Sequence, residues 1–320
     1  MKLAVVFPGQ GSQKVGMGQD WLEHDSVRAA FETADSALGY SISKMCAEGP
    51  EDDLKLTANQ QPGILTVSHA IFEVIRGSLP EIAYFAGHSL GEYTALVAAG
   101  ALSFGDAVAT VHERGSLMQK AVPAGEGAMA AVMRLDAAKI SEINEEVAAE
   151  LKQDLVVANY NSPEQIVVSG SAAAVKAAMP RYTDAGAKRV VELPVSAPFH
   201  SPLMVPAADG LKPRLTSLEF KPMATPVVAN LTAEPYPGDT AQYPLMLHAQ
   251  IFNPVRWTDT VRFFHEKGVT HLLEVGPGKV LRMLSMKIER GIKAFNIEMH
   301  TERDKLEEWL EQALGGEASA

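Results

Sequence analysis

A serine between two glycines stands where an apolar strand gives way to a helix rich in alanine and leucine. Residues 82–86 form a short apolar run typical of a buried strand, and residues 90–102 have the composition of a helix packed on a sheet. The turn between them reads Gly87-His88-Ser89-Leu90-Gly91. Glycines permit a sharp turn with close neighbours, and a serine there sits at a helix N-terminus, where free N–H groups can stabilise an oxyanion. The pattern predicts a nucleophilic serine on an α/β fold; the alternative is a serine that only caps the helix.

Composition excludes several classes of protein. The 320 residues carry a formal net charge of −11 at pH 7, which argues against a nucleic-acid-binding surface. The single cysteine, Cys46, excludes an internal disulfide framework and a cysteine-rich metal site. No apolar stretch is long enough to span a bilayer, and the apolar run 3–7 ends at Pro8-Gly9, which indicates a first strand and not a signal peptide. We therefore expect a cytoplasmic protein that binds neither nucleic acid nor membrane.

The order of the predicted elements divides the chain into two parts. Up to about Val122, strands alternate with helices, which indicates an α/β layer fold. From Gly127 the order becomes βαββαβ, which is typical of a ferredoxin-like unit. We expect an α/β core from residues 1–124 and 197–320, with residues 125–196 inserted as a small subdomain. The predicted core elements are strands 3–7, 82–86 and 271–275, helices 27–38, 61–79 and 90–102, and helices that open at Ser103 and Lys279. The predicted small-subdomain elements are strands 128–135, 155–159, 165–169 and 188–193 and helices 137–151 and 172–183.

A serine nucleophile needs a general base within hydrogen-bond reach. Of the nine histidines, His200 is the best candidate, because three prolines stiffen the loop 194–202 that contains it. His88 adjoins the serine, but neighbouring side chains on a sharp turn point apart. The alternative is a histidine that lies on the surface or is satisfied by partners within the core.

Arg114 falls in an otherwise apolar stripe of a predicted helix. Ala107, Val111, Arg114 and Met118 share one helix face. A guanidinium that faces the interior needs an anion, and its planar fork suits a carboxylate. From the residues alone we favour a structural acidic partner, or a head group that reaches solvent. A substrate carboxylate is the alternative.

The loop after the first strand also contributes to the predicted site. Loops at the carboxyl ends of parallel strands gather at one edge of the sheet, so Gln10 could lend a backbone N–H to an oxyanion; the loop is otherwise only a tight turn. The dinucleotide fingerprint Gly-x-Gly-x-x-Gly fails, because Lys14 takes the third glycine position. No other segment resembles a cofactor or metal site, so neither is expected.

Six motifs resemble the malonyl-CoA:acyl-carrier-protein transacylase family of fatty-acid synthesis, and the resemblance covers essentially the whole chain. The motifs are Pro8-Gly9-Gln10-Gly11-Ser12-Gln13, Gly87-His88-Ser89-Leu90-Gly91-Glu92-Tyr93, Asn161-Ser162-Pro163 with Gln165, Pro194-Val195-Ser196 through His200, Asn253-Pro254-Val255-Arg256-Trp257 and Glu274-Val275-Gly276-Pro277-Gly278. The resemblance implies a hydrolase-like parallel-sheet α/β core with a ferredoxin-like insert. This agrees with the order of the predicted elements.

The resemblance also implies a ping-pong reaction without a cofactor. Ser89, activated by His200, would take the malonyl group from malonyl-CoA as an ester, and the phosphopantetheine thiol of acyl carrier protein would then accept it. The family pattern places the oxyanion hole at the backbone N–H groups of Gln10 and Leu90. It would also make Arg114 the clamp for the malonyl carboxylate, which reverses the preference stated above.

Two further residues take predicted roles from the resemblance. The backbone carbonyl of Gln250 would orient the histidine in place of the acid of an ordinary triad. Phe199 resembles malonyl-selective members, and its ring would leave little space for a 2-methyl branch. We therefore expect poor transfer of methylmalonyl groups, which a comparison of kcat/KM for the two substrates would test.

Other readings remain open beside a fatty-acid transacylase. A serine thioesterase or esterase would share the serine and histidine, and a free-standing acyltransferase could serve a polyketide synthase. A catalytically inactive carrier-binding module is a third reading. Nothing in the sequence suggests an interface, so we expect a monomer. A basic run at Lys279, Arg282, Lys287, Arg290 and Lys293 is a solvated helix face or, together with Lys188-Arg189, a docking surface for the acidic carrier.

Overall fold

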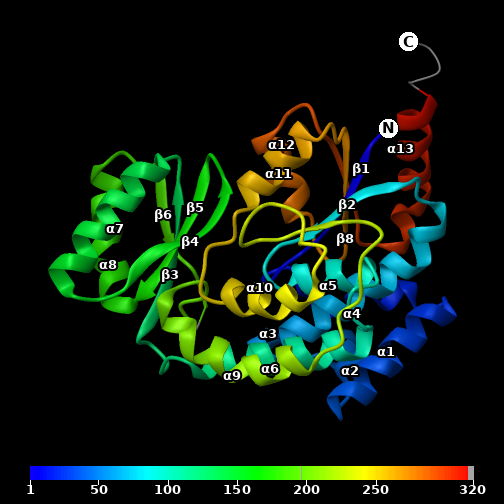
Figure 1. The fold of residues 1–320 in the computed structure, drawn as a ribbon, viewed down its shortest axis with the longest axis horizontal. Helices are drawn as coiled ribbons and strands as arrows, with labels where there is room; N and C mark the ends of the chain where they lie inside the picture. The colour runs from blue at the N-terminus through cyan, green and yellow to red at the C-terminus, as the bar shows by residue number, and fades with distance from the viewer. Residues whose placement is uncertain (196, 316–320) are drawn as a thin grey trace.

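The computed structural model describes residues 1–195 and 197–315 and contains two β-sheets (Figure 1). The larger sheet is parallel, with the strand order β7-β2-β1-β8-β9, and the smaller is antiparallel, with the order β4-β5-β3-β6. The predicted fold class, a parallel-sheet α/β core with a small βαββαβ unit, is confirmed.

The large unit consists of a parallel sheet and the helices that surround it. Its strands are β1 (Leu3–Phe7), β2 (Ile82–Gly87), β7 (Val227–Val228), β8 (His271–Val275) and β9 (Lys293–Ile297). Its α-helices are α1 (Asp25–Leu38), α2 (Ile42–Glu48), α3 (Glu51–Lys55), α4 (Thr57–Ile75), α5 (Gly91–Ala98), α6 (Phe104–Lys120), α9 (Val205–Ser217), α10 (Tyr243–Gln250), α11 (Trp257–Glu266), α12 (Val280–Ile288) and α13 (Arg303–Gly315). Short 3₁₀ turns are η1 (Gln19–Trp21), η2 (Arg76–Ser78), η3 (Pro202–Met204), η4 (Thr240–Gln242) and η5 (His300–Glu302).

Both faces of the large sheet are buried, which explains why its strands are continuously apolar. In β1, Leu3 and Val5 join the core cluster that includes residues of α1, α4 and α6, whereas Ala4 and Val6 join the cluster that includes α11 and α12. Side chains of a strand alternate between its faces, so one short apolar run can serve two helical layers.

The loops after β1 and β2 meet at the carboxyl edge of the large sheet. The two strands pair in parallel, with Phe7 opposite Gly87, and the His88 N–H donates to the Phe7 carbonyl at 3.1 Å. β2 and β8 flank β1 on opposite sides, so this edge is the point where strand order reverses. Such a point is where open α/β sheets usually place their ligands.

The smaller unit lies at one end of the molecule, with its two helices on the outer side of its sheet (Figure 1). It comprises β3 (Gly127–Met133), α7 (Ala137–Leu151), β4 (Leu155–Ser162), β5 (Gln165–Ser171), α8 (Ala172–Asp184) and β6 (Arg189–Glu192). All these elements fall within residues 125–196, and they enclose a separate apolar core. The predicted boundary residue Ser196 lies outside the described residues. Reciprocal backbone hydrogen bonds between β4 and Val255 join the two units.

Several predicted elements end elsewhere in the structure, and several were missed. The helix expected over residues 90–102 stops at Ala98, because Gly100 adopts a left-handed φ of 75°. The helix expected to begin at Gln61 begins at Thr57, four residues before that point. Strands β7 and β9 and helices α2, α3, α9, α10, α11 and α13 had no prediction. The bounds predicted for β1, α7 and β8 match those observed.

Candidate active site

Ser89 occupies the turn between β2 and α5, with a backbone φ of 51° in the left-handed region. A non-glycine residue in that region is strained, and such strain is concentrated at functional sites. The flanking glycines are required by close contacts. A Cβ on Gly87 would lie 1.9 Å from the backbone of Gly91, and a Cβ on Gly91 would lie 2.2 Å from the Phe7 carbonyl oxygen. Asn230 holds the turn: its Oδ1 accepts from the Ser89 N–H at 2.7 Å, and its Nδ2 donates to the Gly87 carbonyl at 2.6 Å.

His200 faces the serine from the proline-rich loop before η3. Its Nε2 lies 2.8 Å from Ser89 Oγ. Its Nδ1 lies 3.0 Å from the Gln250 carbonyl oxygen and 3.1 Å from that of Asn253. Because a carbonyl oxygen only accepts, these contacts assign the ring proton to Nδ1. The Nε2 lone pair is therefore directed to the serine hydroxyl, and the backbone φ of 56° at His200 is a second left-handed strain in the same site.

The pKa of His200 is lowered to about 3. Burial is the main cause, and the positive charge of Arg114 adds to it, whereas the hydrogen bonds to the Gln250 and Asn253 carbonyls act in the opposite direction. The imidazole is consequently neutral at physiological pH. That is the form required of a general base.

The apolar stripe predicted around Arg114 is buried in the structure. Arg114 lies on α6 and is 1% exposed, and Ala107, Val111 and Met118 are buried along the same helix face. The alternative in which the guanidinium reaches solvent is therefore wrong.

The partners of the Arg114 guanidinium are neutral. Nη1 donates to Gln61 Oε1 at 2.8 Å, and Nη2 donates to Gln250 Oε1 at 2.9 Å and to Ser89 Oγ at 3.1 Å. Its Nε has no hydrogen-bond partner among the described residues. Within the same residues no carboxylate forms a direct ion pair with this cation. A structural acidic partner, favoured from the residues alone, is thus not in direct contact with it.

The nearest balancing charge is one residue further away, at Glu92. Gln250 Nε2 donates to Glu92 Oε2 at 2.9 Å, the Asn230 N–H donates to the same oxygen at 3.1 Å, and the Tyr236 hydroxyl donates to Oε1. Burial raises the pKa of Glu92, and the hydrogen bonds from Tyr236 and Gln250 oppose that rise. The Gln250 side chain therefore links this buried carboxyl group to the guanidinium beside the serine.

A cavity of about 120 Å³ lies in front of the serine. It is lined by Gln10, His88, Ser89, Met118, Met129, Asn159, Leu193, Val195, Phe199 and His200. Within the described part of the chain, the backbone N–H groups of Gln10 and Leu90 donate no hydrogen bond. Phe199 is 6% exposed and forms part of the cavity wall, as its predicted role requires.

Sequence reasoning missed four contributors to this arrangement. Glu92 and the carbonyl of Asn253 stand inside the quoted motifs, where they had no assigned role. Gln61 and Asn230 come from distant segments, and nothing in their local sequence marks them. His88 is held apart from the reacting atoms, because its Nε2 lies 2.8 Å from Asn161 Oδ1.

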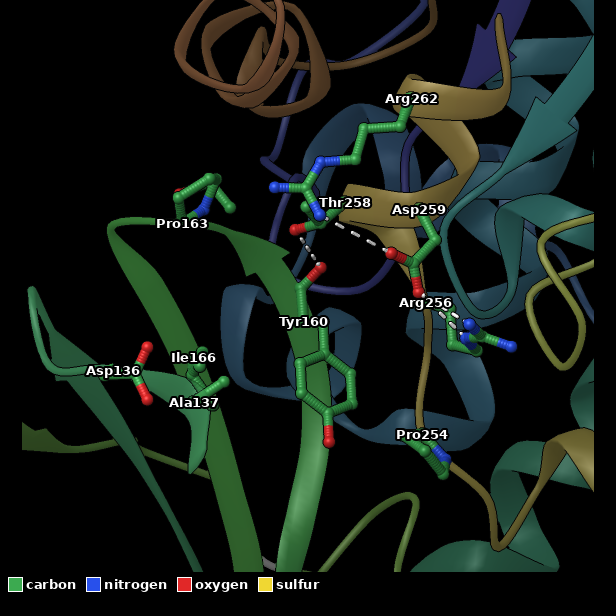
Figure 2. A pocket seen from close by; sticks show the side chains of 11 residues that line it. Asp136, Ala137, Tyr160, Pro163, Ile166, Pro254, Arg256, Thr258, Asp259 and Arg262 are labelled. Carbon is green, nitrogen blue, oxygen red and sulfur yellow. Dashed lines mark hydrogen bonds and ion pairs between the residues drawn. The ribbon is translucent and has the colours of Figure 1, made fainter. Parts of the chain in front are cut away.

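A second cavity, of about 650 Å³, lies between the small unit and α11 (Figure 2). Its polar groups contact one another. Asp259 Oδ2 accepts from Arg256 Nε at 2.9 Å, Asp259 Oδ1 lies 3.9 Å from Arg262 Nη1, and Thr258 Oγ1 donates to the Tyr160 carbonyl at 2.9 Å. This cavity contains none of the residues around the serine.

The predicted basic run does not form one helix face. Lys287 and Arg282 lie on α12, which ends at Ile288, and Lys293 begins strand β9. Arg282 is half-buried, and its Nη1 donates to Asn296 Oδ1 at 2.9 Å. The helix interpretation fails because a strand follows α12 after only a short turn.

Comparison with known proteins agrees with this geometry. The model of the family described as acyl transferase domain matches residues 4–303. The chain belongs to the acyl transferase family. Among relatives of this acyl transferase, the malonyl CoA-acyl carrier protein transacylase of Bacillus subtilis is 44% identical over 298 residues, covering 92% of this chain and 93% of the relative. The Escherichia coli K12 protein of the same name is 45% identical over 292 residues, covering 90% and 93%.

Solved structures of similar proteins extend the agreement to the fold of this acyl transferase. An acyl carrier protein S-malonyltransferase from Vibrio cholerae has a TM-score of 0.92 at 40% identity, covering 96% of this chain and 100% of that one. A malonyl-transacylase in complex with a type II polyketide synthase acyl-carrier protein has a TM-score of 0.93 at 40% identity, covering 96% of this chain and 99% of that one.

Among the described residues, no helix combines the length and the apolar character needed to cross a membrane.

Proposed function

We propose that this acyltransferase moves a malonyl group from malonyl-CoA to the phosphopantetheine thiol of acyl carrier protein, through an ester on Ser89, and so supplies fatty-acid chain elongation. The observation that carries the proposal is the contact of Ser89 Oγ with two groups of different function. A neutral imidazole lies 2.8 Å from it, and a buried guanidinium, which has no ionic partner among the residues the structure describes, lies 3.1 Å from it.

In the first half-reaction, His200 Nε2 takes the hydroxyl proton as Ser89 Oγ attacks the thioester carbonyl carbon. The negative charge that develops on the carbonyl oxygen is accepted by the N–H groups of Gln10 and Leu90. Collapse of the tetrahedral intermediate breaks the carbon–sulfur bond, and the imidazolium returns its proton to the departing CoA sulfur. The malonyl group remains as the serine ester.

The second half-reaction reverses these steps with a different thiol. His200 removes the proton from the phosphopantetheine sulfur, which attacks the ester carbonyl, and Ser89 leaves with that proton. No redox change occurs and no cofactor is needed, because both carriers deliver or accept the acyl group through the same type of thioester.

Two backbone carbonyls serve where an ordinary triad has a carboxylate. Those of Gln250 and Asn253 hold the Nδ1–H and so fix the tautomer and the ring orientation. Carbonyl dipoles stabilise an imidazolium less than a full negative charge would, which accords with the lowered pKa of His200. The base is neutral at rest and is charged only while the tetrahedral intermediate exists.

Arg114 supplies selectivity for an acyl group that carries a free carboxylate. A buried guanidinium is costly without an anion, and the two neutral amides that now contact it are weaker partners than a bidentate carboxylate. Its Nε, which has no hydrogen-bond partner in the described part of the chain, gives the guanidinium an unused donor. A bound malonyl group would thus bring the counterion that the protein itself withholds from direct contact.

A hydrolase is the rival function. A thioesterase needs the same serine and histidine, but it has no use for a buried carboxylate clamp. Service to a polyketide synthase is a second candidate, favoured by the similar transacylase found with a type II polyketide synthase carrier.

The carrier protein is expected to dock through basic groups near the site. Lys188-Arg189 and Lys279–Lys293 are the candidate segments, with Arg282 less available because it contacts Asn296. Charge reversal at Lys287 should weaken transfer to the carrier at low salt and leave serine loading unchanged. The monomeric state and the cytoplasmic location predicted from the sequence remain predictions.

The proposed function is tested by following labelled malonyl groups from malonyl-CoA to holo-acyl carrier protein. Transfer that depends on the carrier, with little free malonate, supports a transacylase. Rapid release of malonate in the absence of carrier would instead identify a thioesterase. Carriers from fatty-acid and polyketide systems, compared by kcat/KM, separate the two pathways.

A further inference from the structure

Three side chains of the types that ligate metal ions converge where the segment before α1 lies against the segment after β9. Glu23 and His24 precede α1, and His300 begins η5 after strand β9. The His300 Nε2 atom lies 3.1 Å from His24 Nε2 and 2.9 Å from Glu23 Oε1, and His24 Nε2 lies 3.6 Å from the same oxygen. None of the three lines the cavity at the serine.

The spacing of these donor atoms suits a small transition-metal ion. The circle through the three atoms has a radius of about 1.9 Å, slightly below the 2.0–2.1 Å of ordinary zinc–nitrogen and zinc–carboxylate bonds. An ion placed just off the plane of the three atoms would reach all of them at normal bond lengths.

Hydrogen bonds alone cannot satisfy all the contacts among these three side chains. A neutral imidazole Nε2 carries either one proton or one lone pair. If His300 Nε2 donates to the Glu23 carboxylate, it has no lone pair left for His24. If it accepts from His24, it cannot donate to the carboxylate. A cation that accepts three lone pairs satisfies all the contacts at once.

The surroundings hold the two imidazoles in place. The fully buried Trp21 ring packs edge-on against His300, with ring centroids 5.0 Å apart, and its Nε1 donates to the Glu298 carbonyl at 2.8 Å. The His300 N–H donates to Asp20 Oδ2 at 2.5 Å. A rigid frame lowers the entropy lost when a metal ion is bound.

We propose that Glu23, His24 and His300 form a site for a divalent transition-metal ion, of which zinc is the best match, that ties the start of α1 to the segment after β9. Imidazole ligands select zinc, nickel, cobalt or copper over magnesium or calcium. The side chain of Glu23 is 65% exposed, so water can fill the remaining coordination positions. The ion stabilises the fold and takes no part in acyl transfer.

The test uses the full chain, freed of metal with a chelator, and zinc chloride as the probe. Isothermal titration should give one site per chain, and zinc at about 100 times its Kd should raise the Tm by roughly 3–5 °C. Magnesium should leave the Tm unchanged. His24→Ala and His300→Ala should each remove both effects, whereas His265→Ala, at an exposed histidine elsewhere, should remove neither.

Three outcomes would overturn the proposal. One is the absence of zinc binding to the wild-type protein at micromolar concentration. Another is equal binding by the His24→Ala and His265→Ala variants, which would place the ion elsewhere. A third is a zinc-dependent rise in Tm in the His24→Ala, His300→Ala double variant as large as in the wild type. Glu23→Gln, which preserves shape, should weaken zinc binding about 10–100-fold and so checks the site without any loss of folding.

Discussion

Two cavities that lie between the small unit and the core, one large and one at Ser89, differ in how the nearby charges are partnered. The larger one, about 650 Å³, contains Arg256 and Arg262, and both lie within 4 Å of Asp259. The smaller one, about 120 Å³, lies beside the Arg114 guanidinium, whose hydrogen bonds within the described residues go only to amides and a hydroxyl. The larger volume therefore lies at Asp259, whereas the charge without an ionic partner among the described residues lies beside Ser89.

The partnering of charges, and not the volume of a cavity, indicates where chemistry is to be expected. An exposed ion pair is already satisfied and contributes little beyond solubility. A buried cation without a direct counterion, next to a strained serine and a histidine of lowered pKa, is expensive to maintain and has meaning only if something binds there.

Replacement of the base should have the largest effect. His200→Ala is expected to lower the rate of serine loading by about 10³-fold or more, because nothing else accepts the hydroxyl proton. The loading rate is measured by rapid quench with labelled malonyl-CoA. In overall malonyl transfer to holo-acyl carrier protein, the Ser89→Ala, His200→Ala double variant should be no slower than Ser89→Ala alone. An additive loss would mean that the two residues do not act as a unit.

Removal of the guanidinium should cost less and should depend on the substrate. Arg114→Ala is expected to lower kcat/KM for malonyl-CoA by about 10²–10³-fold, as expected for the loss of a buried charge partner. Loading from acetyl-CoA, which lacks the carboxylate, should not fall in parallel. Arg114→Lys keeps the charge without the planar fork and should recover only part of the activity. Equal losses for both acyl groups would assign Arg114 a structural role.

The pH profile should lack the inflection of an ordinary histidine. With the pKa of His200 at about 3, kcat/KM for serine loading should stay nearly flat from pH 8 to 5. Because the unfolded histidine has a pKa near 6.5, the unfolded chain binds more protons between pH 6.5 and 3, and the folded state loses stability as pH falls through that window. Urea unfolding at pH 7 and 5 should show a smaller loss for His200→Gln than for the wild type. A loading rate that halves near pH 6.5 would contradict the assignment.

Changes in the large cavity should have the smallest effect. Arg256→Ala and Arg262→Ala each remove a partly exposed arginine near Asp259 and should change malonyl loading by less than about twofold. Stability should fall by no more than about 1 kcal/mol, measured by urea unfolding. A large loss of loading in the Arg262→Ala variant would show that the volume of this cavity serves the reaction after all.

The sequence was most informative where the structure is local. The strand–turn–helix around Ser89 and the order of the small unit depend on short apolar runs and glycines, so they could be predicted. The two-residue strand β7 could not, because Val227–Val228 carries too little periodicity to differ from a loop. Strand β9 was hidden by Lys293, whose charge suggested a helix surface although it lies at the exposed start of the strand.

The parts of the site that the sequence did not predict depend on contacts between distant segments. Periodicity placed Arg114 in the interior but could not supply its partners, because Gln61 lies on another helix and Gln250 is 136 positions away. The preference for an acidic partner followed from the usual rule for buried charges. That rule fails here because the balancing carboxyl of Glu92 acts through an intervening amide.

The central claim, an acyl group held on Ser89, is tested most directly by intact-protein mass spectrometry after mixing with malonyl-CoA. The account predicts a single added malonyl group, absent from Ser89→Ala and discharged when holo-acyl carrier protein is added. An adduct that persists in Ser89→Ala, or turnover of malonyl-CoA without any serine ester, would contradict it.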